Sequence, residues 1–474
     1  MLQKHTVIIG AGISGLTLGW SLKHQKKDGN KLTIYQKKDG NKLTILESSK
    51  RPGGWIQTKN EDGFLFEQGP RSFRSGGTGI ATLQLIEHLG LQNELLFANK
   101  AAKIRYIYTD NKLQSLPTGL LSTLYSPFFF KFLKGLWTDC LAARCQEDDE
   151  TIYTFAKRRF GAQMAELFFD PLISGIYAGD IKKLSLKSCF PSLHVLESQH
   201  RSLFFGALSK KKPPSVMVNE KPLSSFVEHA SRQGIFTLRN GIETLTDKLA
   251  ENLKEELRLD SPVKRLTFEN GKSCIELLDG QRIIADELHL AIPPNQLAPL
   301  FKTSCETIYE QLNLFETASI SVINCGYHYP VLNKKGFGYL VPSKEKQKLL
   351  GVVWDSSAFP EQNAHSQQTR LTAMIGGAHF ANFSSFDESA LIELALKELH
   401  CHLGIRKRPD CILFKRAHEA IPQYTVGHTA RVAVLKHELK KLPAKVSVLG
   451  NGYHGVSVND CVAYANVTGH CSEL

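Results

Sequence analysis

The residues that decide the fold stand near the amino end and read Thr6-Val7-Ile8-Ile9-Gly10-Ala11-Gly12-Ile13-Ser14-Gly15. The apolar run at residues 6–9 predicts a short buried strand, and the leucines at positions 16, 18 and 22 predict a helix directly after it. A G-x-G-x-x-G motif between a strand and a helix is typical of dinucleotide binding. The first glycine permits the tight turn, the second admits a pyrophosphate, and the third lets the helix pack on the strand. We therefore expect residues 10–15 to hold a dinucleotide at the helix N-terminus.

An 11-residue tandem repeat precedes the second predicted strand. Residues 26–36 read KKDGNKLTIYQ, and residues 37–47 read KKDGNKLTILE. Only the second copy ends in an acid, so we place the second strand at Lys42–Glu47 and expect the Glu47 carboxylate to accept hydrogen bonds from ribose hydroxyls. The first copy is predicted to be either an extra loop or a duplication that the fold tolerates, because loop insertions cost little.

Two more glycine-containing segments follow Glu47 and Ser48. Arg51-Pro52-Gly53-Gly54-Trp55 brings a second glycine pair beside the cofactor, and a short hairpin at residues 64–67 leads into Gly69-Pro70-Arg71-Ser72. An arginine in a Gly-Pro turn is well placed to meet a carboxylate or a pyrophosphate. A surface ion pair is the alternative interpretation of Arg71, and it stays open at this point.

Composition limits the class of protein. The 474 residues suggest about three structural units, and 58 Lys and Arg against 46 Asp and Glu give a net charge of +12 spread along the chain, so we expect no nucleic-acid partner. Ten cysteines without a C-x-x-C motif indicate reduced thiols in a cytosol-like compartment, and no signal peptide is expected before the first strand. No metal site is predicted, because His400 and His402 would point to nearly opposite sides of a helix. Secreted, collagenous, fibrous and polytopic membrane classes are excluded.

These motifs together resemble the FAD-dependent amine oxidase superfamily, and the sequence GGWIQT…FEQGPRSFR resembles its protoporphyrinogen oxidase branch. Further segments carry the same resemblance along nearly the whole chain: PLISGIYAGD at 171–180, GFGYLVPS at 336–343, LGVVWDSSAFPEQ at 350–362, AIPQYTVGH at 420–428 and GNGYHGVSVNDC at 450–461.

The resemblance implies an α/β fold with an FAD-binding Rossmann-like domain of the amine oxidase type, an α+β substrate domain and a helical insertion. We assign residues 1–78, 216–298 and 436–474 to FAD binding, 79–215 to the insertion, and 299–435 to the substrate domain. The sequence also predicts a helix from Glu243, a strand from Val263, a turn at Asp279-Gly280 into one strand at 283–290, a strand at 446–449 and a helix from Asn459.

The stretch from Leu116 to Trp137 is unusually apolar, with Lys131 and Lys134 in its second half. Two interpretations stay open. One is a helix of the core, and the other is a monotopic membrane patch, because aromatic and basic residues suit the membrane interface. Peripheral attachment to the cytoplasmic membrane, a cytoplasmic location and a homodimer are compatible with the resemblance.

The implied activity is that of an FAD-dependent oxidoreductase acting on CH–CH groups with oxygen as acceptor. It would oxidise protoporphyrinogen IX to protoporphyrin IX by six electrons in haem biosynthesis, with hydrogen peroxide as the second product. Coproporphyrinogen III is the alternative substrate, and another amine-oxidase-type flavoenzyme is the alternative function. The flavin N5 is the hydride acceptor, so no side chain is expected to act as a catalytic group.

By resemblance, Val263 would cover the adenine, while Val456, Ser457 and Val458 would close the flavin. The residues predicted to bind noncovalent FAD are Gly10, Ala11, Gly12, Ile13, Ser14, Gly15, Glu47, Ser48, Arg51, Gly53, Gly54, Trp55, Gly69, Pro70, Arg71, Ser72, Val263, Val456, Ser457 and Val458. The residues predicted to contact the porphyrinogen in a broad apolar pocket are Arg71, Gly175, Leu340 and Met374.

Overall fold

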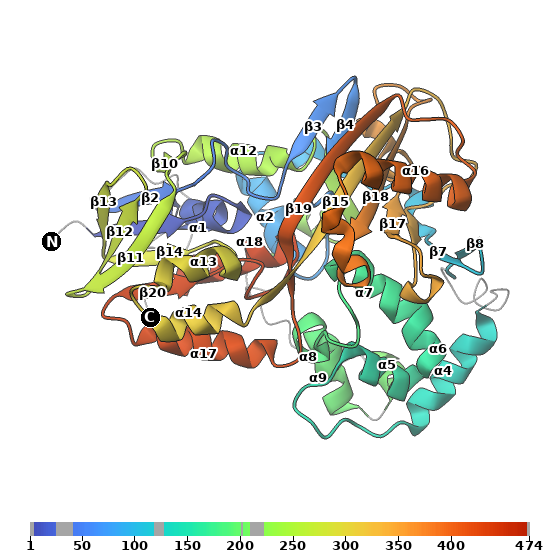
Figure 1. The fold of residues 1–474 in the computed structure, drawn as a ribbon, viewed down its shortest axis with the longest axis horizontal. Helices are drawn as coiled ribbons and strands as arrows, with labels where there is room; N and C mark the ends of the chain where they lie inside the picture. The colour runs from blue at the N-terminus through green and yellow to red at the C-terminus, as the bar shows by residue number, and fades with distance from the viewer. Residues whose placement is uncertain (1–3, 25–40, 118–127, 201, 209–221, 472–474) are drawn as a thin grey trace.

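The computed structural model describes residues 4–24, 41–117, 128–200, 202–208 and 222–471. Figure 1 shows a sheet with β2, β14 and β20 on the left, a sheet built around β15 at the upper right, and a group of helices at the lower right. The first copy of the tandem repeat, residues 26–36, lies outside the described residues.

The sheet that carries the glycine motif is parallel and has five strands in the order β10-β2-β1-β14-β20. These strands are β1 (His5–Ile9), β2 (Lys42–Leu46), β10 (Leu257–Arg258), β14 (Glu287–Leu290) and β20 (Lys445–Val448). The predicted strands at 6–9, 42–47 and 446–449 are therefore confirmed to within one residue at each end. The amino end, the middle and the carboxyl end of the chain all contribute to one sheet.

Both faces of this sheet are covered, as expected for parallel strands. Ile8 faces a core formed with α1 (Ile13–Lys23), α2 (Gly79–His88), α12 (Glu243–Asn252) and α18 (Val458–Cys471), together with α11 (Ser225–Ala230). Val7 and Ile9 face the other core, which contains β11 (Val263–Glu269), β12 (Lys272–Leu277), β13 (Arg282–Ala285), α13 (Pro294–Phe301), α14 (Glu306–Asn313) and α17 (His428–Lys440). The helices predicted from Glu243 and near Asn459 are confirmed.

The single strand predicted at 283–290 is wrong, because the chain changes sheet at Asp286. β13 pairs with β12 in a separate antiparallel sheet, whereas β14 pairs with β1. Asp286 fixes the crossing by bonding His5 twice: its carboxylate accepts from the His5 N–H at 2.8 Å, and its own N–H donates to the His5 carbonyl at 2.8 Å.

The second large sheet has seven strands in the order β19-β15-β18-β17-β16-β7-β8. They are β7 (Tyr106–Thr109), β8 (Lys112–Ser115), β15 (Glu316–Tyr327), β16 (Gly338–Leu340), β17 (Leu349–Val353), β18 (Thr369–Gly376) and β19 (Cys411–Gln423). Helix α16 (Glu388–Leu403) packs on one face of it, and α15 (Asp355–Ala358) follows β17.

Two small sheets connect these parts. One pairs β3 (Thr58–Glu61) with β4 (Phe64–Glu67), and the other has the order β5-β9-β6, with β5 (Phe73–Arg74), β6 (Leu95–Phe97) and β9 (Ile235–Leu238). Segment 79–215 was predicted to be a helical insertion, but it contains β6, β7 and β8. Its strands complete sheets of the neighbouring parts because they pair with β9 and β16.

Helix α2 of this segment packs on the parallel sheet, whereas the later helices of the segment gather at the lower right of Figure 1. They are α4 (Phe129–Leu141), α5 (Ile152–Phe160), α6 (Ala162–Met164), α7 (Asp170–Tyr177), α8 (Leu186–Cys189), α9 (Pro191–Gln199) and α10 (Leu203–Leu208). Arg159 of α5 lies at their centre without exposure to solvent. It forms ion pairs with Asp139 of α4 at 3.2 Å and with Glu197 of α9 at 2.8 Å.

For the described part of the apolar stretch, the core-helix interpretation is wrong. The side chains of Phe130 and Trp137 are 79% and 71% exposed, and Leu133 and Leu141 are also exposed. The residues that α4 buries are Gly135 and Asp139. Residues 118–127 of the stretch lie outside the described residues. Within the described ranges, no helix has both the length and the apolar character needed to cross a membrane.

Candidate cofactor and substrate site

Three turns from distant parts of the chain meet at the N-terminus of α1. The Gly53 N–H donates to the Ala11 carbonyl at 2.8 Å, and Gly53 pairs with Gly12 in an isolated β-bridge. Gly450, in the turn after β20, lies beside Ser14, because a Cβ at position 450 would be 3.8 Å from the Ser14 hydroxyl oxygen. The structure thus brings together segments 10–15 and 51–55 and the turn after β20, which leads into Val456, Ser457 and Val458, and each of the three contains residues predicted to bind the cofactor.

The glycines of the first turn have different physical reasons to be glycine. A Cβ on Gly15 would lie 1.9 Å from the Gly10 carbonyl oxygen, so the helix can pack on the strand only without one. Gly10 has a φ of +102°, in the region that favours glycine. A Cβ on Gly12 would meet nothing within 4 Å. The backbone of Gly12 therefore faces open space at a helix N-terminus, which fits a bound pyrophosphate.

Glu47 lies where β2 ends and reaches toward this turn. Its carboxylate accepts from the Ala11 N–H at 2.8 Å and from the Ser49 N–H at 2.9 Å. The backbone carbonyl of Glu47 accepts from the Ser261 N–H at 2.8 Å, which brings the start of β11, with the half-buried Val263, close to this end of the site. An adenosine between Glu47 and Val263 is consistent with this placement. The neighbouring Ser48 hydroxyl lies 3.4 Å from the Glu47 carboxylate.

The guanidinium of Arg51, which was predicted to bind the cofactor, makes hydrogen bonds within its own loop. It donates to the carbonyls of Gly54 at 2.6 Å and Ile56 at 3.1 Å, and it pairs with Glu243 at 3.1 Å. These contacts hold the Gly53–Gly54 turn against the first glycine turn. The structure therefore gives Arg51 a bracing role in the shape of the site.

The carboxyl-terminal turn ends at the N-terminus of α18. The Ser457 hydroxyl donates to the Asp460 carboxylate at 2.6 Å and accepts from the Asp460 N–H at 3.1 Å, so it caps the helix. Asn459 anchors the same turn through hydrogen bonds with Thr82 at 2.7 Å and the Arg74 carbonyl at 2.8 Å. Val456 and Ser457 are accessible here, and the positive end of the α18 dipole is suited to a flavin that becomes anionic on reduction.

The turn with Gly69, Pro70, Arg71 and Ser72 lies between the two large sheets. A Cβ on Gly69 would be 2.1 Å from the Trp55 carbonyl oxygen, so this turn packs directly on the Gly53–Trp55 segment. Arg71 is largely buried and pairs with Asp355 at 3.2 Å. The Thr372 hydroxyl donates to the other Asp355 oxygen at 2.7 Å. Arg71 is thus an internal cation, and the surface ion pair left open by the sequence is wrong.

The residues predicted to contact substrate meet on one face of the seven-stranded sheet. Leu340 of β16 lies opposite Gly351 of β17, and Gly351 lies opposite Met374 of β18. Gly175 of α7 adjoins this row, since a Cβ there would lie 2.7 Å from a methyl group of Leu340. Met374 packs in the same cluster as Trp55. Because alternate residues of a strand share a face, Thr372 lies on the Met374 side, and Arg71 joins the row through Asp355.

Sequence reasoning missed Gly351, Asp355 and Thr372. The first two stand in the segment LGVVWDSSAFPEQ, which carried the resemblance but received no role. Gly351 lies between Leu340 and Met374 in the row, and the Leu340 side chain packs over it, because a Cβ there would lie 2.9 Å from a Leu340 methyl group and 2.6 Å from the Tyr339 carbonyl oxygen. Only the strand register shows this arrangement.

The buried carboxyl group of Glu67 lies close enough to Arg71 and Asp355 to interact with their charges. Burial raises the pKa of Glu67 to about 7, although the Ile242 N–H and the Thr58 hydroxyl, which donate to it at 2.8 and 2.9 Å, oppose the shift. A carboxyl whose pKa is raised by folding binds a proton more tightly in the folded chain. Its contribution to stability is therefore greatest at low pH and is lost as the pH rises through about 7.

The variant Glu67→Gln should remove this pH dependence, because the amide stays neutral at every pH. Between pH 5 and pH 8 the free energy of unfolding of the wild-type protein should fall by up to about 3 kcal/mol because of Glu67. That of Glu67→Gln should fall by less over the same range. Thermal melting of both proteins across this pH range measures the difference. Glu61→Gln, in the same hairpin but exposed, is the control and should keep the wild-type slope. Equal slopes for Glu67→Gln and wild type would contradict the assignment.

The chain is similar to known flavin-dependent oxidoreductases and porphyrinogen oxidases. The family described as flavin containing amine oxidoreductase matches residues 13–463. Protoporphyrinogen oxidase of Homo sapiens is 33% identical over 488 residues, covering 97% of this chain and 96% of that protein. Coproporphyrinogen III oxidase of Bacillus subtilis is 30% identical over 479 residues, with the same coverage of 97% and 96%.

Solved structures show the same fold. A crystal structure of a protein from Exiguobacterium sp. 255-15 superposes with a TM-score of 0.81 at 24% identity, covering 99% of this chain and 98% of that one. A putrescine oxidase variant superposes with a TM-score of 0.68 at 13% identity, over 99% and 98% of the two chains. The chain belongs to the flavin-containing amine oxidoreductase family.

Proposed function

We propose that this chain is an FAD-dependent, oxygen-dependent porphyrinogen oxidase that converts protoporphyrinogen IX to protoporphyrin IX in haem biosynthesis. The relatives at 30–33% identity over nearly the whole chain include oxidases of protoporphyrinogen and of coproporphyrinogen III, so coproporphyrinogen III is the alternative substrate for the same site. The observation that carries the proposal is the row Leu340–Gly351–Met374, an apolar sheet face joined to the dinucleotide turns through Trp55.

The residues present fit FAD. The open backbone at Gly12 would take the pyrophosphate, Glu47 the ribose, and the turn at Val456–Val458 the flavin end. Bound FAD would supply the redox chemistry, taking two electrons in each of three rounds and passing them to dioxygen, so that one porphyrinogen and three dioxygen give one porphyrin and three hydrogen peroxide.

The chain's own residues would bind and orient the substrate. Leu340, packed between Gly175 and Gly351, and Met374 form the apolar face against which the ring system would lie. Asp355 holds the Arg71 guanidinium at the edge of this face, where a cation suits a propionate group. The close packing of Gly175 on Leu340 limits how far the ring can extend toward α7. Positioning and exclusion of water are the tasks left to the protein.

We further propose that the enzyme is cytoplasmic and attaches peripherally to a membrane through α4 and α10. The exposed side chains of Phe130, Leu133, Trp137 and Leu141 recur at helical spacing along one stripe of α4. Phe204 and Phe205 of the neighbouring α10 are also exposed. Lys131 and Lys134 beside this stripe suit anionic headgroups. An apolar membrane-bound substrate would reach an enzyme at that surface directly.

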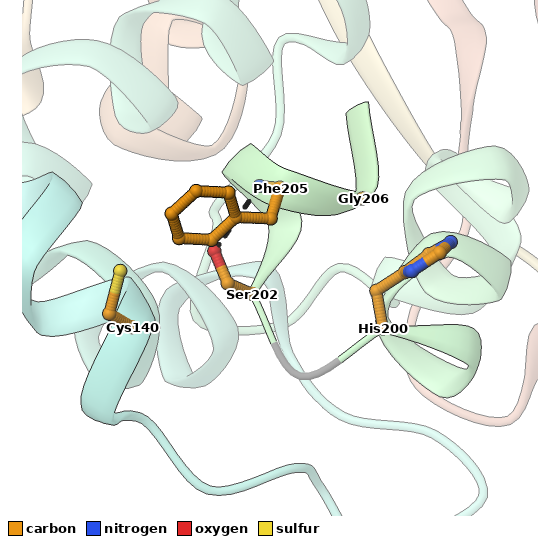
Figure 2. Close-up of a pocket in the computed structure, with 5 residues that line it drawn as sticks. All are labelled: Cys140, His200, Ser202, Phe205 and Gly206. Atoms are coloured by element: carbon orange, nitrogen blue, oxygen red, sulfur yellow. Dashed lines mark hydrogen bonds between the residues drawn. The ribbon is translucent and has the colours of Figure 1, made fainter. Parts of the chain in front are cut away.

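A hollow adjoins this surface. Figure 2 shows Cys140 of α4 on one side of α10 and His200 on the other, with Ser202, Phe205 and Gly206 between them. Its volume is about 510 Å³. The Phe205 N–H donates to the Ser202 hydroxyl at 3.4 Å, which shapes the start of α10. The hollow shares Phe205 with the exposed apolar residues, so it borders the surface proposed for membrane contact.

The proposed reaction is tested directly with purified protein. It should carry noncovalent FAD, released on denaturation, and should produce porphyrin fluorescence from a porphyrinogen in air. Protoporphyrinogen IX and coproporphyrinogen III are assayed in parallel, with the products identified by chromatography and hydrogen peroxide measured at three per porphyrin. Protein with neither FAD nor porphyrin formation would refute the proposal.

The cofactor turn is tested by two alanine variants. Gly12→Ala should fold, because its Cβ meets no protein atom, but should bind FAD about tenfold or more weakly, since the methyl group enters the space proposed for the pyrophosphate. Gly15→Ala should fail to yield folded protein, because its Cβ would overlap the Gly10 carbonyl. Flavin titration of apoprotein and circular dichroism measure the two effects. Unchanged FAD affinity in Gly12→Ala would contradict the placement.

Membrane attachment is tested with the double variant Phe130→Ser/Trp137→Ser. Each large side chain contributes about 2 kcal/mol when buried, so the variant should bind vesicles of phosphatidylcholine and phosphatidylglycerol about a hundredfold or more weakly. Cosedimentation measures binding, and Leu278→Ser, exposed on the β12–β13 hairpin, is the control. If the wild-type protein does not bind vesicles and is a dimer, and the double variant is a monomer, the surface is a homodimer contact instead.

A further inference from the structure

Tyr424 stands between β19 and α17 and is buried, in the segment PQYTVGH. Its hydroxyl makes two hydrogen bonds to the turn that follows β20. It donates to the Asn451 carbonyl at 2.5 Å, and it accepts from the Gly455 N–H at 2.8 Å. A single oxygen atom therefore ties together both ends of the segment Asn451–Gly455.

The held segment leads directly into the proposed flavin contacts. Gly450 and Gly455 have φ angles of +120° and +118°, so the turn depends on backbone conformations that other residues rarely adopt. Val456, Ser457 and Val458 follow Gly455 without an intervening residue. A small displacement of Gly455 would thus move the N-terminus of α18 relative to Gly12.

Tyr424 is itself fixed from the opposite side. Its carbonyl accepts from the Ser185 N–H at 2.8 Å, and Thr425 pairs with Leu184 in an isolated β-bridge. The ring of His428 stacks on the Tyr424 ring with centroids 3.9 Å apart. These contacts leave the hydroxyl little freedom, so its position is set by residues 184–185, which lie directly before α8.

Burial also keeps the hydroxyl in its donating form. The pKa of Tyr424 is raised well above its ordinary value by loss of solvent, so the phenol stays protonated at neutral pH. One donor and two acceptor positions are available on a tyrosine hydroxyl, and the two bonds to the turn use them without conflict.

We propose that Tyr424 is a positioning residue for the flavin: its hydroxyl fixes the Asn451–Gly455 turn and thereby the contacts of Val456–Val458. The inference rests on the proposed FAD site and adds a residue from the substrate side of the chain to it. Because the Tyr424 backbone is bonded to Ser185, the same residue links the helical group to the cofactor. Tyr424 does not itself contact reacting atoms in this proposal.

The test compares Tyr424→Phe with Tyr327→Phe in the full chain. Tyr327 is also buried, and its hydroxyl has no hydrogen-bond partner among the described residues, so its loss should change nothing. Tyr424→Phe should bind FAD about tenfold to a hundredfold more weakly, as expected when a buried N–H loses its acceptor. It should also shift the flavin absorption spectrum and reduction potential, because the turn beside the ring is displaced.

A merely structural role would behave differently. It would lower the melting temperatures of apoprotein and FAD-loaded protein equally, whereas a positioning role should reduce the stabilisation that FAD adds. If Tyr424→Phe has the same FAD affinity, flavin absorption spectrum and reduction potential as wild type, the inference is overturned, but the proposed function is not affected. Wild-type protein that binds no FAD would instead refute the proposed function.

A measurement on wild-type apoprotein covers the case in which Tyr424→Phe does not fold. Hydrogen exchange by mass spectrometry should show the Gly455 amide protected, since the Tyr424 hydroxyl accepts from it in a buried setting. Exchange at Gly455 as rapid as in an exposed turn would contradict the proposed clamp.

Discussion

The cofactor site depends on the contact between two backbones at the start of the chain. The peptide at Gly15 lies so close to the Gly10 carbonyl that a single methyl group would prevent it. This approach sets the angle at which α1 leaves β1, and that angle leaves the backbone of Gly12 accessible at the start of the helix. The Gly53 turn and the Gly450 turn then pack on this frame through Ala11 and Ser14.

The local parts of this frame could be predicted from sequence, because glycine turns and buried strands leave short patterns. The turn at residues 10–15, the strand before Glu47 and the helix from Glu243 were predicted for that reason and are confirmed. The division of 283–290 between β13 and β14 could not be predicted, because an apolar run looks the same whether it stays in one sheet or crosses to another. The crossing is decided by the hydrogen bonds of Asp286 with His5.

The arrangement of the substrate face could be predicted from sequence even less well. Leu340, Gly351 and Met374 are separated in sequence, and only the register of three antiparallel strands aligns them. The role of Arg71 was left open by the sequence, and Arg51 was predicted to bind the cofactor, because an arginine can serve a ligand or a carboxylate of the protein equally well. The structure separates them: Arg51 braces its own loop with Glu243, whereas Arg71 crosses to Asp355 on the other sheet.

The contact between the hairpin β3–β4 and the seven-stranded sheet is polar although it is buried. Arg370 is fully enclosed and donates to the carbonyls of Leu65 at 2.8 Å and Phe359 at 3.0 Å and to the Asn363 side chain at 2.9 Å. Burial lowers its pKa from the ordinary value, with Asp355 and Glu67 opposing that shift. Directional bonds of this kind fix one orientation between the hairpin β3–β4 and the sheet, which apolar contacts alone specify less well. A site assembled from two sheets needs such an orientation.

Helix α4 reverses the usual arrangement of a surface helix, in which apolar side chains face the core. It buries Asp139 in an ion pair with Arg159, and it turns Phe130 and Trp137 outward. Burying a charge requires compensation by a partner, while exposing large apolar groups forgoes the free energy of their burial. Stability alone would favour the opposite faces, so the pattern indicates a requirement outside the folded chain. The ion pairs of Arg159 with Asp139 and Glu197 hold α4 against its neighbours without burying its apolar stripe. The stripe therefore stays exposed, as the proposed membrane contact requires.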